Sequence, residues 1–165
     1  TNPQKREQNV NWDIFDFAVF GAMLLGVGVI YALAKRRTNN TTYRFALGIA
    51  LGAAFLLVWV NGAVGIIGNE NNDANMMFFG VLLVGVVGAI LARLRPKGMA
   101  RAMYATAFAQ ALVAVIALVA NLGLAGPSWP WDVLVLTGFF AALWLFSGRL
   151  FRKAARHPLS DPLIR

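Results

Sequence analysis

The sequence lacks cysteine, and His157 is its only histidine among 165 residues. Without thiols there is no disulfide framework, no thiolate metal site and no cysteine nucleophile. One histidine without cysteine also leaves zinc and haem chemistry without their usual ligands. P-loop, G-x-S-x-G and paired-carboxylate motifs are missing as well. We therefore expect no metal and no cofactor, and the sequence does not favour an enzyme.

Charge is also scarce, because only 13% of the residues are charged whereas 59% are hydrophobic. Such a chain has too little polar surface to cover a soluble globule. A bilayer core of about 30 Å needs roughly 20 apolar residues of helix per crossing. Continuous apolar runs exclude the alternating strands of a membrane barrel. The sequence therefore predicts an all-α integral membrane bundle of five transmembrane helices, over residues 14–34, 45–67, 76–92, 102–124 and 133–148.

Acidic residues are few on the side of the membrane where basic residues gather. Of the 15 lysines and arginines, 13 follow the first, third and fifth predicted helices, and the positive-inside rule makes that side cytoplasmic. The first helix is too long for a cleaved signal peptide and precedes a basic cluster, so we expect it to remain. The prediction is an extracytoplasmic tail over 1–13, a transmembrane domain over 14–148 and a cytoplasmic basic tail over 149–165. The opposite side holds six of the seven acids: Glu7, Asp13, Asp16, Glu70, Asp73 and Asp132.

A pI near 10.9 raises the question of nucleic acid. The basic residues, however, lie in short loops next to the membrane, where anionic lipid headgroups are the simpler partner. We expect lipid contact at the cytoplasmic face and no nucleic acid.

Shifting the sequence by 60 residues produces an internal match from the outer loop through two helices. True duplication would make the first two helix pairs parallel repeats about an axis along the membrane normal, as in some transporters. Chance matches among common Ala, Gly and Val residues explain the pattern equally well. The matched pairs include Asn11 with Asn71, Asp13 with Asp73, Gly28 with Gly88, Lys35 with Arg95 and Asn61 with Asn121.

The polar stretch GNENNDAN separates the second and third apolar runs. Asp13, Asp73 and Asp132 each begin a helix that runs inward, where a carboxylate can cap free N–H groups and meet the helix dipole. We interpret these acids as caps. The asparagines of this stretch are typical turn formers, expected to be exposed and to need no further function: Asn69, Asn71, Asn72 and Asn75.

A few polar residues remain after capping and turns are assigned. Asn61 lies about 9 Å below the outer end of its predicted helix, and Gln110 about 12 Å deep, at about 1.5 Å per residue. Two interpretations stay open: hydrogen bonds between helices, or a solute pocket open to the outer face. We expect Asn61 to face the bundle and to bond with Gln110, with a backbone carbonyl or with Asp16. The candidate pocket comprises Asp16, Asn61, Glu70, Gln110 and Asn121.

Small residues recur at intervals of four along the predicted helices. In lipid they let helix backbones approach closely, either within one chain or between chains. The candidate packing positions are Gly48 with Gly52, Gly85 with Ala89, and Gly138 with Ala142.

The stretches VGIIGNENNDANMMFFGV, RPKGMARA and FFAALWLFSGRLFRKAAR resemble a group of small, uncharacterised multi-pass proteins of the bacterial inner membrane. The resemblance covers the second to fifth predicted helices and implies a bacterial cytoplasmic membrane. It carries over no functional residue. With short loops and few surplus polar residues, we expect a non-enzymatic accessory or scaffold protein, with membrane protein partners or self-association. The alternative is a small channel or transporter with the polar pocket described above.

Overall fold

The computed structural model describes residues 14–157, apart from the side chains of residues 15 and 16. The described chain is helical and contains no strand, which confirms the predicted fold class. Five helices are long and apolar enough to cross a membrane, as in a multi-pass membrane protein. The elements are α1 (Ile14–Arg37), α2 (Thr41–Ala63), the short 3₁₀ helix η1 (Asp73–Met76), α3 (Met77–Leu91), α4 (Pro96–Val119) and α5 (Trp131–Arg156).

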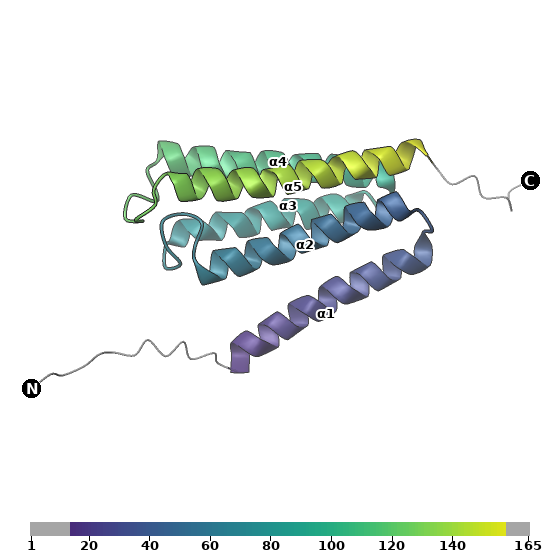
Figure 1. Cartoon of the computed structure of the whole chain (residues 1–165), viewed down its shortest axis with the longest axis horizontal. Helices are drawn as coiled ribbons and strands as arrows, with labels where there is room; N and C mark the ends of the chain where they lie inside the picture. Colours follow the sequence, from purple (N-terminus) through teal and green to yellow (C-terminus); the bar gives the residue numbers. More distant parts are fainter. Residues whose placement is uncertain (1–13, 158–165) are drawn as a thin grey trace, which may run out of the picture.

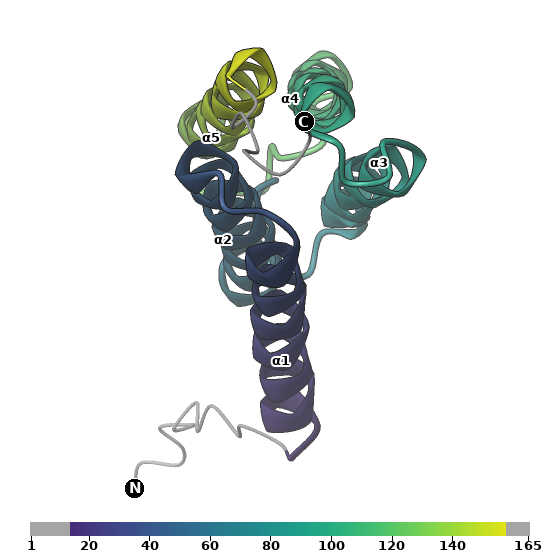
Figure 2. The same ribbon diagram turned by 90° about the vertical axis from the view of Figure 1, so that its right-hand side faces the viewer.

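Helices α2, α3, α4 and α5 form a four-helix bundle, and α1 leans away from it beside α2 (Figures 1 and 2). We call one end of the bundle the basic end: it holds the α1–α2 turn, the α3–α4 turn and the end of α5. The other, acidic end holds the α2–α3 and α4–α5 loops, with the carboxylates of Glu70, Asp73 and Asp132. A gathering of lysines and arginines at one end is typical of membrane-spanning helices.

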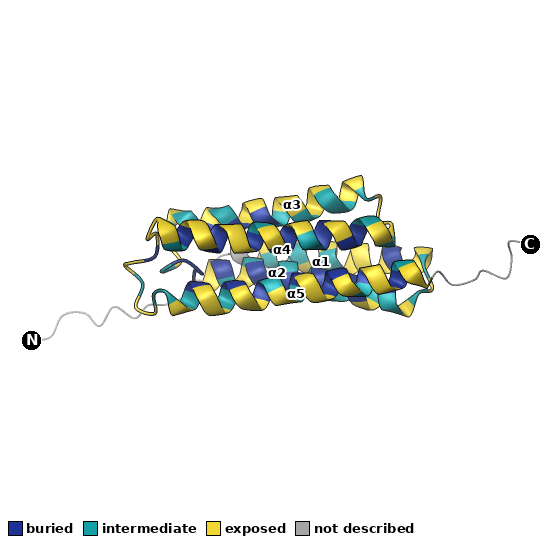
Figure 3. Ribbon diagram, turned by 90° about the horizontal axis from the view of Figure 1, so that it is seen from above, coloured by how far each residue is buried: buried dark blue, intermediate teal, exposed yellow. Residues whose placement is uncertain are grey.

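The core lies between α2, α3, α4 and α5, while the outer faces of the helices are exposed (Figure 3). Its largest fully buried side chains include Leu57, Phe78, Phe140 and Phe151. Helix α1 contributes little to this core: 6% of its apolar window is buried, against 39% for α4. Ala34 is its one buried residue among those whose burial is described. Lipid therefore has to solvate most of α1 unless another molecule covers it.

All five predicted helices have different bounds in the structure, and the largest differences are at the start of α4 and the end of α5. Helix α4 begins at Pro96 rather than 102, because proline suits the first turn of a helix, where its missing N–H costs nothing. Helix α5 continues to Arg156 rather than ending at 148. Apolar runs mark what can lie in hydrocarbon, whereas charged residues can extend a helix into the headgroup region.

The predicted aspartate caps are wrong in detail. Asn72, not Asp73, caps η1, because its side chain accepts a bond from the Ala74 N–H. Pro130 occupies the N-cap of α5, and Asp132 lies within the first turn, where its carboxylate accepts a bond from the free Val133 N–H at 2.8 Å, as the capping prediction expected. Both acids still lie close to the positive end of a helix dipole. Asp13 lies outside the described residues.

Two helices end in turns with residues in the left-handed region. At the end of α4, Asn121 has φ 52°, and Leu122 N–H donates to the Ala117 carbonyl at 3.0 Å. At the end of α3, Arg93 has φ 50°, and Leu94 N–H donates to the Ala89 carbonyl at 3.2 Å. This hydrogen-bond pattern is the Schellman motif, which favours glycine or asparagine at the left-handed position. Asn121 is therefore explained by helix termination.

Side chains at the basic end join the turns to the bundle. Asn40 caps α2 and also donates to the Ala154 and His157 carbonyls at 3.5 and 3.4 Å. The Tyr43 hydroxyl donates to the Leu94 carbonyl at 2.6 Å. Such bonds fix the α1–α2 turn against α5 and the α3–α4 turn against α2, whereas α1 packs mainly on α2.

Candidate functional site

A network that we call the asparagine node holds the α2–α3 loop at the acidic end. Its centre is Asn75, whose side-chain oxygen accepts bonds from the N–H groups of Ile66 and Ile67 at 3.0 and 2.8 Å. Its amide nitrogen donates to the Asn69 carbonyl at 2.7 Å. The Asn61 side chain donates to the Asn75 carbonyl at 3.0 Å. One side chain thus satisfies three backbone groups of a buried loop.

The expectation that Asn75 is an exposed turn former is wrong, since it is only 5% exposed. Ile66 and Ile67 are fully buried, so their N–H groups need a protein partner and Asn75 supplies it. Asn61 is buried and bonds outside its own helix, as expected, and its partner is a backbone carbonyl rather than Gln110. The node therefore accounts for Asn75 and for the amide nitrogen of Asn61, whereas Asn61 Oδ1 is buried without a partner among the described residues. Because α2 ends at Ala63, Asn61 lies in its last turn and not about 9 Å below its outer end.

The two loops of the acidic end are also joined to each other. Asn72 donates to the Leu122 carbonyl at 2.6 Å. A Cβ added at Gly68, which has φ 78°, would lie 3.2 Å from Cα of Gly123, so a glycine is needed there for both conformation and space. A hydrogen bond and a close backbone contact therefore join the two loops of the acidic end.

Gln110 lacks the hydrogen-bond partners that Asn75 has. It is fully buried on α4, and neither its amide nitrogen nor its oxygen has a hydrogen-bond partner among the described residues. The side chains of Thr137 and Trp144 on α5 are buried and unpartnered in the same way. A Cβ added at Gly148 would lie 3.3 Å from Cβ of Met103, so by antiparallel register Gln110 lies at a level between Thr137 and Trp144. Buried polar groups normally have hydrogen-bond partners, so the unpaired side chains at this level of the bundle need an explanation.

The remaining pocket candidates lie elsewhere. Glu70 is exposed in the α2–α3 loop, and Asn121 is exposed at the end of α4. The side chain of Asp16 lies outside the described part of the chain. No hydrogen bond that the structure describes joins any two of Asn61, Glu70, Gln110 and Asn121. The structure therefore divides the candidate set between the acidic end and the bundle interior.

The candidate small residues also separate into two groups. Gly85 and Ala89 pack α3 against α4, since a Cβ added at Gly85 would lie 3.2 Å from Oγ1 of Thr106. Gly48 faces Tyr31 of α1 at 3.8 Å. The other candidates make no close contact within the chain: Gly52 and Gly138 have nothing within 4 Å of an added Cβ, and Ala142 is exposed.

Two further close helix contacts use glycines that four-residue spacing did not select. A Cβ added at Gly88 would lie 2.7 Å from Cβ of Ala102, and one at Gly148 would lie 2.9 Å from Cε1 of Tyr104. These glycines allow α3 and α5 to pack on α4. Because α1 and α2 diverge while α3 and α4 pack closely, the two helix pairs differ in arrangement, and duplication stays a prediction.

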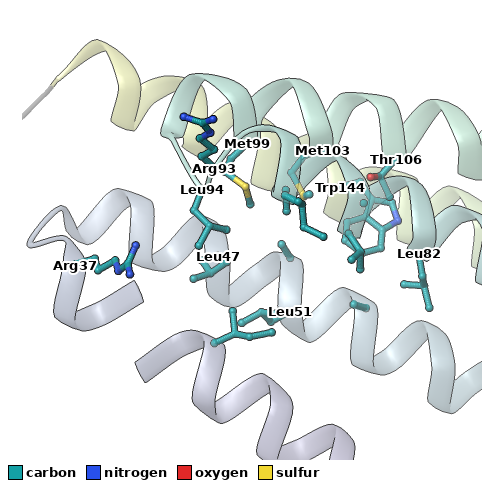
Figure 4. Close-up of a pocket in the computed structure, with 17 residues that line it drawn as sticks. Arg37, Leu47, Leu51, Leu82, Arg93, Leu94, Met99, Met103, Thr106 and Trp144 are labelled. Carbon is teal, nitrogen blue, oxygen red and sulfur yellow. The ribbon is translucent and has the colours of Figure 1, made fainter. Parts of the chain in front are cut away.

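A hollow that we call the groove lies between α1, α2 and α3, over the faces of α4 and α5 (Figure 4). Its volume is about 520 Å³, and its lining is almost entirely apolar. Leu47 and Leu51 line it from α2, and the small residues Gly85 and Ala89 line it from α3. Arg37 and Arg93 lie at its basic end, and Trp144 lies deeper in the bundle.

A second hollow, the basic pocket, lies between α4 and α5 at the basic end. It also has a volume of about 520 Å³. Its lining residues are Lys97, Ala100, Arg101, Tyr104, Arg152, Ala155 and Arg156. Neither the groove nor the basic pocket is lined by Asn61, Glu70, Gln110 or Asn121.

Within residues 14–157, no group of three or more His, Cys, Asp or Glu side chains is placed to hold a metal ion. Comparison with known proteins finds no match to a family model, to a curated protein or to a solved structure. The features of the described chain that bear on function are the two hollows, the position of α1 and the unpaired polar groups.

Proposed function

We propose that the protein is a non-enzymatic accessory or scaffold protein of the bacterial cytoplasmic membrane, and that a transmembrane helix of a partner protein packs in the groove beside α1. The observation that carries this proposal is the position of α1, which stands outside the four-helix bundle and leaves an apolar groove beside it. Phe20 touches Phe55 and Trp59, with ring centroids 5.5 and 5.1 Å away, so α1 is attached to α2 at this level.

The groove has the surface that a helix needs. Ala54 of α2 is small and only partly buried, and small residues allow the backbone of another helix to approach closely. Gly85 and Ala89 line the groove from α3 and also pack against α4. A partner helix also has to accommodate the guanidinium groups at the basic end of the groove. The partner is therefore apolar along its length, with polar or acidic residues at the end that meets Arg37 and Arg93.

Photo-crosslinking in native membranes tests this interface. A crosslinking residue replaces Ile90, which is 67% exposed and lines the groove, or Val135, which is 64% exposed and lies on α5 outside it. We expect a crosslinked partner protein from position 90 and none from position 135. Equal products from both positions, no protein product, or only a second copy of this chain would contradict the proposal.

The orientation proposed for the chain places the start of α1 outside and the end of α5 in the cytoplasm. The support is the clustering of described lysines and arginines at the basic end. Because the sequence has no cysteine, one introduced cysteine reports one position. An impermeant thiol reagent added to intact cells should label Asn71→Cys and not Thr41→Cys, and the reverse pattern would invert the topology.

A small channel or transporter is the second candidate, supported by the unpaired side chains of Gln110, Thr137 and Trp144 in the bundle interior. Water or a solute at this level would supply their missing hydrogen bonds. A dry interior favours the scaffold, whereas a hydrated interior favours transport.

A further inference from the structure

The basic pocket gathers four cationic side chains from two antiparallel helices. Lys97 and Arg101 are one turn apart on α4, and Arg152 and Arg156 are one turn apart on α5. Residues four apart on a helix share a face, so each pair points to the same side of its helix. The alanines between them, Ala100 and Ala155, are too small to fill the hollow, which is why it remains open.

Among residues 14–157, no carboxylate with a described side chain lies near this charge. Every acidic side chain that the structure describes lies at the acidic end, in the α2–α3 loop or the first turn of η1 or α5. Like charges four residues apart on a helix repel each other. Helix α4 adds the positive end of its dipole, and its first turn holds no acid. The pocket therefore concentrates positive potential in a hollow of molecular size.

The surface next to the pocket, toward the middle of α4 and α5, is apolar. Phe108 lies one turn beyond Tyr104 on α4 and is 72% exposed. Leu145 lies two turns before Arg152 on α5 and is 41% exposed. A molecule with its anionic group among the four cations would therefore have apolar surface directly beneath it, along the faces of the same two helices.

We propose that the basic pocket binds the headgroup phosphate of an anionic phospholipid, with the acyl chains lying along Phe108 and Leu145. Arginine pairs well with phosphate oxygens because its planar group donates two parallel hydrogen bonds. Basic pockets between transmembrane helices at the membrane surface suit such headgroups. The apolar surface beneath the pocket favours a lipid over a soluble phosphate. This site is separate from the groove, so it stands or fails independently of the proposed partner helix.

The test compares two double variants of equal net charge. Arg101→Gln with Arg152→Gln removes two pocket cations, whereas Arg36→Gln with Arg149→Gln removes two exposed cations that line neither hollow. All four positions are exposed, so the fold should tolerate both variants. Native mass spectrometry and titration with phosphatidylglycerol in detergent measure the affinity, with phosphatidylcholine as the zwitterionic reference.

We expect the pocket variant to bind phosphatidylglycerol about tenfold more weakly or worse, since each basic residue near a charged membrane surface contributes about 1 kcal/mol. The control variant should retain its affinity. Equal losses in both variants would mean that binding follows net charge alone, and the site would be rejected. Tight binding of inorganic phosphate without lipid would assign the pocket to a soluble anion instead. Equal binding of phosphatidylcholine would also overturn the proposal.

Discussion

The asparagine node and the α4–α5 interface hold the bundle together by different means. In the node, the Asn75 side chain makes three hydrogen bonds to backbone groups, and its own carbonyl accepts a fourth from Asn61. In the interface, Gly148 brings α5 close to Tyr104 and Met103, whereas the neighbouring polar side chain of Gln110 is unpaired. Hydrogen bonds hold the first region, and close packing holds the second.

This difference separates structural polar residues from residues that the fold does not need. Asn75 and Gln110 are both buried amides, at 5% and 0% exposure, so burial alone does not distinguish them. Their partners do. A buried amide with all its groups paired stabilises the fold, whereas one with none paired weakens it unless another molecule provides the bonds. Gln110 is therefore the better functional candidate of the two.

The largest effect is expected from breaking the node. Asn75→Ala leaves the N–H groups of Ile66 and Ile67 buried without an acceptor, and each such group costs about 1 to 3 kcal/mol. We expect the free energy of unfolding in detergent to fall by about 3 kcal/mol or more. Asn71→Ala, at an exposed position of the same loop, should change it by less than about 0.5 kcal/mol.

A conservative variant sharpens this result. Asn75→Asp keeps an acceptor for both isoleucine N–H groups, and its second oxygen can replace the bond to the Asn69 carbonyl only when the carboxyl is protonated. It should therefore retain more stability than Asn75→Ala. If both node variants unfold as readily as Asn71→Ala, water or another group satisfies the loop and the node does not hold it.

An intermediate effect is expected from breaking the close packing. A Cβ at Gly148 would lie 2.9 Å from Tyr104, so Gly148→Val should lower the unfolding free energy by about 2 kcal/mol through overpacking. Gly138→Val in the same helix is the matched control, since nothing lies within 4 Å of its added Cβ. Chemical denaturation of both variants checks the difference. Equal stability would show that α5 shifts freely on α4.

The sequence predicted the number of helices and their order because long apolar runs have one stable arrangement in a bilayer. It did not predict where α4 begins or where α5 ends, since helices continue past the apolar runs on which the prediction rested. It also gave no sign that α1 stands apart. All five runs are similarly apolar, and packing depends on the shapes of the faces that meet rather than on hydropathy.

The candidate site was predicted only as a list of surplus polar residues. Asn75 was missed because an asparagine next to glycine, glutamate and aspartate is typical of an exposed turn, and only the folded loop buries it. The basic pocket was missed because Lys97 and Arg156 are far apart in sequence, and the antiparallel packing of α4 and α5 brings them to one hollow. The missing information was the long-range pairing of helices for the pocket and the local fold of the α2–α3 loop for Asn75.

The smallest stability effect, and the most informative for function, is expected at Gln110. Gln110→Leu replaces an unpaired buried amide with an apolar side chain of similar size, so we expect it to be neutral or to stabilise the fold by about 1 kcal/mol. A loss of about 2 kcal/mol or more would mean that water or a solute pairs with the amide.

The variant Gln110→Cys then decides between a dry and a hydrated interior, because the chain has no other cysteine. In a dry bundle, a small water-soluble thiol reagent should label it no faster than a buried reference such as Leu57→Cys. Rapid labelling together with a loss of stability in Gln110→Leu would favour a transport pathway through the interior over the scaffold.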